Sequence, residues 1–479
     1  QERDVPFLSR RRLLQSGLAL SAVGLGLPRL GNAATTPRSL TAGPGEALLL
    51  EPGQPKTKTW LYDGVSPGPI LRARQGEEVN VRLVNQLSQP TTIHWHGIRI
   101  DNAMDGVAHL TQEAVLPGGT FDYRFTVPDA GTFWYHPHNR SWEQVARGLY
   151  GLLIVEEPRG QYRPDQDVAI IADDWRLGDD GQIDEASFAH MMDWSHAGRL
   201  GNTLTLNGKD LLDIPVKSGQ RVRLRLCNTC NARVLELRIE DHKVWLMAQD
   251  GQPVSPREVP DGYIRLAPGE RADVFVDVSF DGLDLFGTSA ITEVSGGQRL
   301  VAGRLVPDGT IFRDAPLPVP PLPLPTNPLS TDFDLAGAQA LELLLEGGAM
   351  GRMAQAMHNG QMKDIRSLVG EGFVWALNGT AGMTDTPLFT APRGRTVTVD
   401  MRNDTAWPHA MHFHGHHFKV VERNGKPTNS DAWKDTVLIE RLESAKIAFV
   451  ADNPGKWMIH CHMLEHQAAG MTTWFQVEA

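Results

Sequence analysis

Cysteine is scarce in this sequence, and the few cysteines present do not build a zinc site. Only three occur among 479 residues. Cys227 and Cys230 form a CxxC pair, but no second Cys or His pair accompanies them at zinc-ligand spacing. We expect either a local disulfide or two buried thiols at this pair. The remaining Cys461 needs a functional reason, because an unpaired cysteine is unusual in an oxidising compartment.

The start of the sequence lacks an apolar run long enough to anchor the chain in a membrane. The run from Gly17 to Leu27 is far shorter than the roughly 20 residues that span a bilayer. It follows the letters SRRRLLQ at residues 9–15 and precedes Pro28 and two alanines. This pattern predicts a signal over residues 1–34 for the twin-arginine export machinery, and hence a periplasmic protein without stable membrane insertion.

Basic residues are also fewer than acidic ones. The chain has 46 Lys and Arg against 57 Asp and Glu, a formal net charge of -11 at pH 7. The first 34 residues carry five arginines and two acids, so the remainder is more acidic than the whole. Such a surface repels nucleic acid and anionic membranes and attracts cations. We therefore expect no nucleic-acid partner.

Long helical periodicity is absent, and short strand signals take its place. Alternating apolar segments bounded by Gly, Pro and Asn occur at residues 78–84, 221–227, 273–278 and 396–401. They predict an all-β protein built from sandwiches. The segment 315–328 is so rich in proline that it can form neither a helix nor a central strand, which predicts a stiff linker.

One strand pattern recurs three times with the same internal offsets. Each copy is a glycine followed by apolar residues at the third, fifth and seventh positions and by an asparagine at the ninth. The copies run from Gly76 to Asn85, from Gly219 to Asn228 and from Gly394 to Asn403. They begin 143 and 175 residues apart, so the repeat is a whole domain. The predicted domains cover residues 35–157, 158–314 and 329–479, with the linker at 315–328.

Histidines in the pattern HxH follow the same repeat. Random placement of the 17 histidines predicts about 0.6 such pairs, whereas five are present, the fifth being His414/His416. Four occupy equivalent positions of the first and third repeats: His94/His96 matches His412/His414, and His136/His138 matches His460/His462. The corresponding positions of the middle repeat hold Leu237 and Ile239. Both imidazoles of such a pair lie on one side of a strand, about 7 Å apart along the backbone. We expect a metal site shared by the first and third domains, with the middle domain as spacer.

The last motif adds a second kind of metal ligand. His409, Cys461, His466 and Met471 provide two imidazoles, a thiolate and a thioether, the ligand set of a blue copper electron-transfer site. On a strand, the Cys461 side chain points away from those of His460 and His462. It can therefore bind that copper while its two neighbours reach the shared site behind it.

On these motifs the sequence resembles the three-domain bacterial multicopper oxidases of the laccase and cuprous-oxidase type, over residues 40–479. The resemblance implies three cupredoxin-like Greek-key β-sandwiches and four copper ions: one type 1, one type 2 and a type 3 pair. It implies type 1 ligation by His409, Cys461, His466 and Met471 and type 2 ligation by His94 and His412. For the type 3 pair it implies His96, His136, His138, His414, His460 and His462.

The same resemblance implies the reaction. A reducing substrate, either Cu(I) or a phenol or aromatic amine, gives up electrons singly, and dioxygen takes four of them to form water. A monomer is expected. Two other functions are possible for this fold: an envelope or cell-division scaffold without copper, and a copper-storage protein. Relatives that serve as scaffolds have lost the copper ligands, which argues against the first alternative. A storage protein would not require a thiolate placed between two cluster ligands, which argues against the second.

Two further features concern protons and the donor. Asp105 matches the family's acidic residue beside the cluster and could relay protons, although an Asp before Gly also suits a turn. Gln467 stands where many bacterial relatives have a second acid, and it cannot titrate. Met350, Met353, Met357, His358 and Met362 fall at helical spacing. They predict either a Met-rich helix that gathers Cu(I) or an amphipathic helix with a packed Met face.

Overall fold

The computed structural model describes residues 36–160, 162–278, 289–313 and 315–479. The predicted export signal at 1–34 lies outside these residues. Among the helices that the structure does describe, none is long and apolar enough to cross a membrane.

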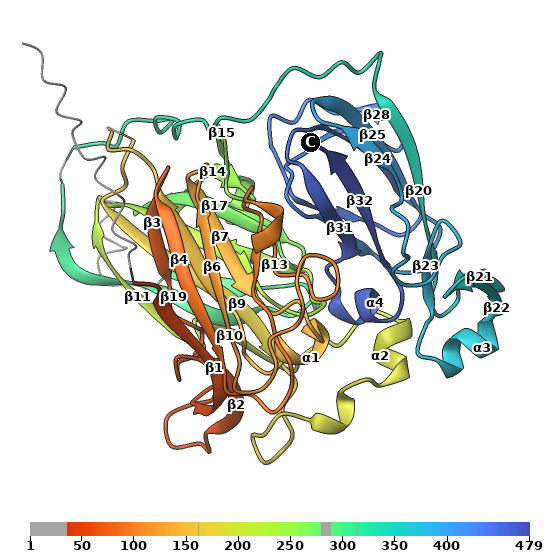
Figure 1. Ribbon diagram of the computed structural model, residues 1–479. Helices are drawn as coiled ribbons and strands as arrows, with labels where there is room; N and C mark the ends of the chain where they lie inside the picture. The colour runs from red at the N-terminus through yellow and green to blue at the C-terminus, as the bar shows by residue number, and fades with distance from the viewer. Residues whose placement is uncertain (1–35, 161, 279–288, 314) are drawn as a thin grey trace, which may run out of the picture. The chain divides into compact units, whose positions relative to one another are not determined.

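The strands of the first 160 residues form one sandwich of two sheets (Figure 1). These strands are β1 (Arg38–Ala47), β2 (Thr57–Tyr62), β3 (Leu71–Arg74), β4 (Glu78–Asn85), β5 (His94–His96), β6 (Thr120–Thr126), β7 (Gly131–His136) and β8 (Gly151–Glu156). One sheet has the order β2-β1-β4-β6 and the other β3-β8-β7-β5. Their facing apolar side chains form a single core.

A second sandwich follows in the chain. Its strands are β9 (Gln166–Trp175), β10 (Thr203–Leu206), β11 (Leu212–Ser218), β12 (Arg221–Asn228), β13 (Leu235–Ile239), β14 (Lys243–Gln249), β15 (Gln252–Glu258), β16 (Tyr263–Leu266), β17 (Arg271–Asp277), β18 (Ser289–Glu293) and β19 (Leu300–Ile311). The sheets have the orders β10-β9-β12-β17-β14-β15 and β11-β19-β18-β13-β16. Leu237 and Ile239, at the positions where the other repeats have histidine, are buried in the core of this sandwich.

The third sandwich contains the C-terminal strands. They are β20 (Gln339–Gly347), β23 (Trp375–Leu377), β24 (Thr390–Pro392), β25 (Arg395–Asn403), β26 (His409–Phe413), β27 (Lys419–Arg423), β28 (Lys426–Pro427), β29 (Thr436–Ile439), β30 (Ser444–Ala451), β31 (Gly455–Cys461) and β32 (Thr472–Glu478). The sheets have the orders β23-β20-β25-β30-β27-β28 and β24-β32-β31-β26-β29. The segment 315–328, which precedes this sandwich, contains neither helix nor strand.

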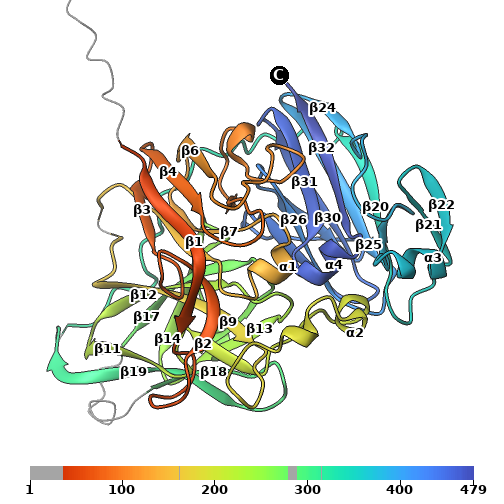
Figure 2. The same cartoon turned by 60° about the horizontal axis from the view of Figure 1, so that its bottom comes forward.

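The helices are short and belong to the connections. They are α1 (Ser141–Gln144), α2 (Met191–Ser195), α3 (Ile365–Gly370) and α4 (Leu464–Ala468), with the 3-10 turns η1 (Asn102–Met104), η2 (Glu185–Ser187) and η3 (Pro260–Gly262). α4 contacts both α1 and α2, so the three sandwiches each contribute one helix to the same place (Figure 2).

The predicted repeat is one strand of each sandwich. β4, β12 and β25 each pair in parallel with one neighbour and antiparallel with the other. The asparagine that ends the strand has the same role in all three, because its Oδ1 accepts the amide two residues on and its Nδ2 donates to carbonyls across the loop. These asparagines are Asn85, Asn228 and Asn403. The sequence repeat therefore corresponds to one equivalent strand in each sandwich, which ends in the same asparagine-stabilised loop.

The helix predicted for the Met-rich segment is wrong. The structure has a hairpin there, with β21 (Gln355–His358) paired to β22 (Gln361–Asp364) and Met357 directly opposite Met362. The two residues between the strands are Asn359 and Gly360, both with positive φ. Asn-Gly is the strongest short signal for a two-residue hairpin turn, and it outweighs the helical spacing of the methionines.

The CxxC pair contains two buried free thiols, so the disulfide alternative is wrong. Cys230 lies in the core of the middle sandwich. Cys227 instead belongs to an apolar cluster that includes Trp134 of the first sandwich and Leu464 of the third. The two cysteines therefore have a packing role.

We predict that Gly106→Ala destabilises the protein more than Gly118→Ala. Both glycines have φ +78°, but a Cβ on Gly106 would overlap the carbonyl of Ile93, the residue before His94, whereas nothing lies near Gly118. The left-handed conformation alone costs about 1–2 kcal/mol for alanine, and the overlap adds to it at Gly106. Urea unfolding of both variants measures the difference. Equal losses of unfolding free energy would contradict a close approach at Gly106.

Candidate metal centre

The eight histidines of the four HxH pairs converge between the first and third sandwiches. All are buried, none more than 6% exposed: His94, His96, His136, His138, His412, His414, His460 and His462. His94 lies directly opposite His136 in the β5–β7 ladder, and His412 lies directly opposite His460 in the β26–β31 ladder. The two ladders are therefore equivalent, as the sequence repeat predicts.

Four of these eight rings have one nitrogen bonded outward and the other without a partner: His94, His96, His136 and His412. In His94, His136 and His412, Nδ1 contacts a backbone carbonyl at 2.8–2.9 Å, while Nε2 is buried and unpaired. A buried polar atom without a partner is costly, and several together require an explanation. The hydrogen bond on Nδ1 leaves the lone pair of Nε2 free for a cation.

The remaining rings bring nitrogens close together. His460 Nε2 lies 3.1 Å from Nε2 of His414 and 3.3 Å from Nε2 of His138. Both ring nitrogens of His462 are buried without a partner. The ligand atoms of several such triplets lie within 4.8 Å of one another. Neutral imidazoles held at these distances suit metal ions, and the residues present fit a cluster of copper ions.

A second group of ligand atoms lies at the end of β31. Cys461 Sγ is 3.7 Å from Nδ1 of both His409 and His466, and these two nitrogens are 3.0 Å apart. The backbone of Met471 bonds to both Cys461 and His466, and the residue is fully buried. Burial raises the pKa of the Cys461 thiol to about 12, so a thiolate here requires a cation beside it.

The outer nitrogens of this group are also paired. His409 Nε2 lies 2.8 Å from Thr405 Oγ1. His466 Nε2 lies 2.7 Å from the carbonyl oxygen of His196, in the segment that follows α2 of the middle sandwich. This carbonyl can only accept, so His466 donates from Nε2 and has its Nδ1 lone pair free. The tautomer suits metal binding through Nδ1.

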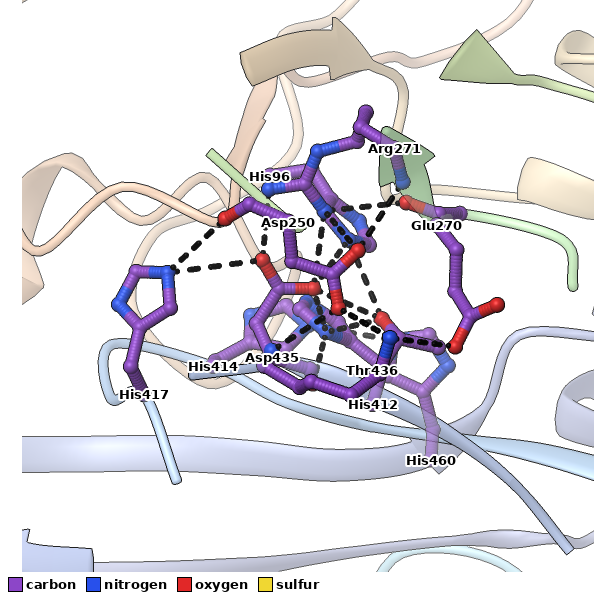
Figure 3. Close-up of polar contacts among 12 residues, drawn as sticks. His96, Asp250, Glu270, Arg271, His412, His414, His417, Asp435, Thr436 and His460 are labelled. Atoms are coloured by element: carbon purple, nitrogen blue, oxygen red, sulfur yellow. Dashed lines mark hydrogen bonds and ion pairs between the residues drawn. The ribbon is translucent and has the colours of Figure 1, made fainter. Parts of the chain in front are cut away.

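Two carboxylates flank the eight histidines in a crosswise arrangement. Asp105 contacts Nδ1 of His414 at 2.9 Å and Nδ1 of His94 at 3.3 Å. Asp435 contacts Nε2 of His96 at 3.0 Å and Nδ1 of His412 at 3.5 Å. Each acid therefore contacts one histidine from the first sandwich and one from the third. Figure 3 shows Asp435 between His96 and His412.

Asp435 was not predicted from the sequence as a residue of this site. It stands much farther beyond its histidine motif than Asp105 does, and therefore has no counterpart in the aligned repeat. Burial opposes its ionisation, but Arg271 and His96 outweigh burial and hold the pKa of Asp435 well below its ordinary value. An acid directly before a buried β-branched strand, β29, was the available signal.

Gln467 takes the place of a second acid on α4. Its Oε1 accepts a hydrogen bond from Ser141 Oγ at 3.2 Å. Glu465, two residues earlier, is buried and accepts from Asn231 Nδ2 at 2.7 Å. Burial raises the pKa of Glu465 to about 7. The carboxyl that titrates near neutral pH on this helix is therefore at 465.

Comparisons with known proteins agree with this arrangement. Three multicopper oxidase family models match residues 47–160, 166–282 and 352–479. The multicopper oxidase MmcO of Mycobacterium tuberculosis is 31% identical over 95% of this chain and 89% of its own length. Laccase-1 of Fomitopsis schrenkii is 29% identical over 86% of this chain and 81% of its own. The crystal structure of a multicopper oxidase from Pseudomonas thermotolerans superposes with a TM-score of 0.79, 32% identity and coverage of 92% and 99%.

The three sandwiches, together with the buried histidine cluster and the His-Cys-His group, are those of a copper-dependent oxidoreductase of cupredoxin-like fold. The chain belongs to the multicopper oxidase family. Members of this family couple the one-electron oxidation of a reducing substrate to the reduction of dioxygen.

We predict that acid destabilises the copper-free protein between about pH 6.5 and pH 4. Eleven described histidines have a pKa below the ordinary 6.5; burial lowers the pKa of His466 and of His416 to about 4. The unfolded chain binds these protons first, so stability falls as pH falls, by up to about 1.4 kcal/mol per histidine and pH unit. Among the aspartates and glutamates that the structure describes, the pKa is raised, through burial, in three, Asp173, Asp250 and Glu465, which oppose the trend.

Urea unfolding of the copper-free protein from pH 6.5 to 4.5 measures this dependence. His416→Gln should make the dependence shallower, since His416 is buried and is not a predicted ligand. His109→Gln is the matched control, because the His109 side chain is 73% exposed. Stability that is flat or rises toward pH 4.5 would contradict the prediction.

Proposed function

We propose that this multicopper oxidase binds four copper ions and oxidises Cu(I) better than bulky phenols. The type 1 ligands are His409, Cys461, His466 and Met471. The type 2 ligands are His94 and His412, and the type 3 ligands are His96, His136, His138, His414, His460 and His462. Bound copper supplies the one-electron redox chemistry and the binding of dioxygen. The observation that carries this proposal is Cys461, whose Sγ faces two imidazoles while its neighbours in sequence belong to the histidine cluster.

The chain's own residues connect the two centres and move protons. Cys461 is bonded through the backbone to His460 and His462, so electrons have a covalent path of two peptide units. Asp105 is the proton relay of this proposal, because its carboxylate contacts cluster histidines from both domains. Export to the periplasm by the twin-arginine route and a monomeric state complete the proposal.

The surroundings of His466 favour a small donor. Its ring is fully buried, and its Nε2 is bonded to the carbonyl of His196 in the middle sandwich. α2, immediately before His196, contacts α4, which contains His466 (Figure 2). A bulky phenol therefore has no free edge of His466 to contact, whereas a metal ion can deliver an electron at the surface of this cover.

One of two exposed thioethers in the Met-rich segment, that of Met350, lies next to that cover. Met350 is 76% exposed and Met362 is 55% exposed. The amide of Ala349 donates to the carbonyl of Ser195, the residue before His196, so Met350 lies within a few residues of the contact to His466. Thioethers prefer Cu(I) to harder ions. The net negative charge of the chain further assists the approach of a cation at low salt.

We predict that Cys461→Ser abolishes the blue absorption band and turnover while the copper of the histidine cluster is retained. Serine cannot supply the soft charge-transfer bond of a thiolate, and the eight cluster histidines are unchanged. Absorption spectroscopy, copper analysis and oxygen uptake on the same sample measure the three properties. Turnover without the blue band would overturn the assignment of Cys461.

We predict that the double variant Met350→Leu and Met362→Leu lowers kcat/KM for Cu(I) about 10-fold and leaves phenol oxidation unchanged. This loss corresponds to roughly 1.4 kcal/mol of activation free energy. Leucine preserves volume and removes only the sulfur. Val369→Leu on the adjacent α3, 39% exposed, is the matched surface control. Oxygen uptake with each donor provides the measurement. If both activities fall together with thermal stability, the methionines have a packing role and the laccase function is the better one.

A further inference from the structure

Asp435 lies where the histidine cluster meets the middle sandwich (Figure 3). Arg271 Nη1 donates to its Oδ1 at 2.9 Å, and Arg271 Nη2 donates to its Oδ2 at 2.7 Å. The same Oδ1 accepts from His96 Nε2 at 3.0 Å and from Thr436 Oγ1 at 2.8 Å. The side chains of Asp435 and Arg271 are at most 1% exposed. One carboxylate thus connects a buried arginine to a cluster histidine.

Arg271 begins β17 and belongs to the domain that supplies no cluster histidine. Two of its other donors are also occupied, since Nε donates to the carbonyl of Thr132 and Nη1 to that of Gly269. A guanidinium fixed at all these points cannot rotate away from Asp435, and a bidentate pair has a defined geometry. The middle sandwich therefore holds the Asp435 carboxylate in one orientation.

The first domain leaves room for this pair. Gly97 follows His96 and has φ +84°, and a Cβ at this position would overlap both the Arg271 guanidinium and the Asp435 carboxylate. All three domains therefore meet at one buried ion pair, and the residue next to a cluster histidine is the one that makes space for it.

The pair determines which nitrogen of His96 faces the cluster. Because the ionised carboxylate only accepts, His96 must carry its proton on Nε2, and its buried Nδ1 then has a free lone pair and no other partner. His94, His136 and His412 present Nε2 instead. We propose that Arg271 and Asp435 are positioning residues through which the middle domain fixes the ring of His96, and with it His412, for copper binding.

The contrast with Asp105 supports a division of roles. Asp105 contacts the other two histidines of the crosswise arrangement, but among the described residues it has no Arg or Lys ion-pair partner. The bidentate contact with Arg271 holds the Asp435 carboxylate in one orientation, whereas Asp105 is not held in this way by an arginine or lysine of the described chain. The two acids occupy similar positions beside the cluster and differ in whether an arginine binds the carboxylate.

The proposal is tested with Asp435→Asn and Arg271→Lys in the copper-loaded full chain. Both should release cluster copper to a chelator about 10–100-fold more readily than the unsubstituted protein, the usual effect of losing the group that orients a ligand. The type 2 electron paramagnetic resonance signal should change as well. The blue band should remain, because His409, Cys461 and His466 are not touched.

Arg223→Lys is the matched control. Arg223 is another buried arginine of the middle sandwich, paired with Asp273 at 2.5 Å and with Glu157 at 2.7 Å, and none of its ion-pair partners is a histidine. Its substitution should lower thermal stability without changing cluster copper retention or the type 2 signal. If Asp435→Asn does not fold, Arg271→Lys alone is compared with Arg223→Lys.

This inference rests on the copper sites of the proposed function, and the two fail differently. Absence of the blue band and of cluster copper from the unsubstituted protein would remove the proposed function. A normal unsubstituted protein whose Asp435→Asn and Arg271→Lys variants retain copper and the type 2 signal unchanged would overturn the positioning role alone. An equal loss in Arg223→Lys would also overturn it, since the effect would then be general destabilisation.

Discussion

The structure depends on burying eight imidazoles, several with an unpaired nitrogen, between two domains that are not adjacent in sequence. Without cations this interface is unfavourable, since several buried ring nitrogens lack a partner and protonation in a dry interior is disfavoured. Copper bound as proposed would give these nitrogens a partner and would join the first and third sandwiches. Metal binding would then be coupled to the association of the two domains.

The middle sandwich makes that interface possible although it supplies none of the imidazoles. Leu237 and Ile239 fill its own core where the other repeats have histidine. Its charged residues are instead directed outward, with Arg223 and Asp273 near the first sandwich and Arg271 paired with Asp435 of the third. The middle domain is therefore more than the spacer that the sequence predicts, because its Arg271 reaches a cluster histidine through Asp435.

The covered position of His466 has a related origin. Its outer nitrogen is bonded to a carbonyl of the middle sandwich, so the domain that fixes one side of the cluster also limits access to the thiolate centre. The helices α1, α2 and α4 meet at this point, one from each sandwich. The cover over His466 and the contact to His96 thus both come from the second domain, and the proposed donor preference rests on this packing.

Local spacing in the sequence was sufficient for much of this protein. The offsets from Gly76 to Asn85 recur because each sandwich uses the same strand end. HxH spacing places both imidazoles on one face of a strand, so the sequence identified the histidines that converge in the structure. Local spacing gave the wrong prediction at Met350–Met362. The methionine spacing predicted a helix, whereas the Asn359-Gly360 turn produces a hairpin. Asp435 had only a weak sequence signal, its place before β29, and the pairing with Arg271 and the carbonyl bonded to His466 had none, because these contacts join segments far apart in the chain. Which nitrogen each ring presents, and which carboxylate keeps a fixed charge, were decided by tertiary packing, since hydrogen-bond partners in a buried interface are chosen by geometry and not by spacing along the chain.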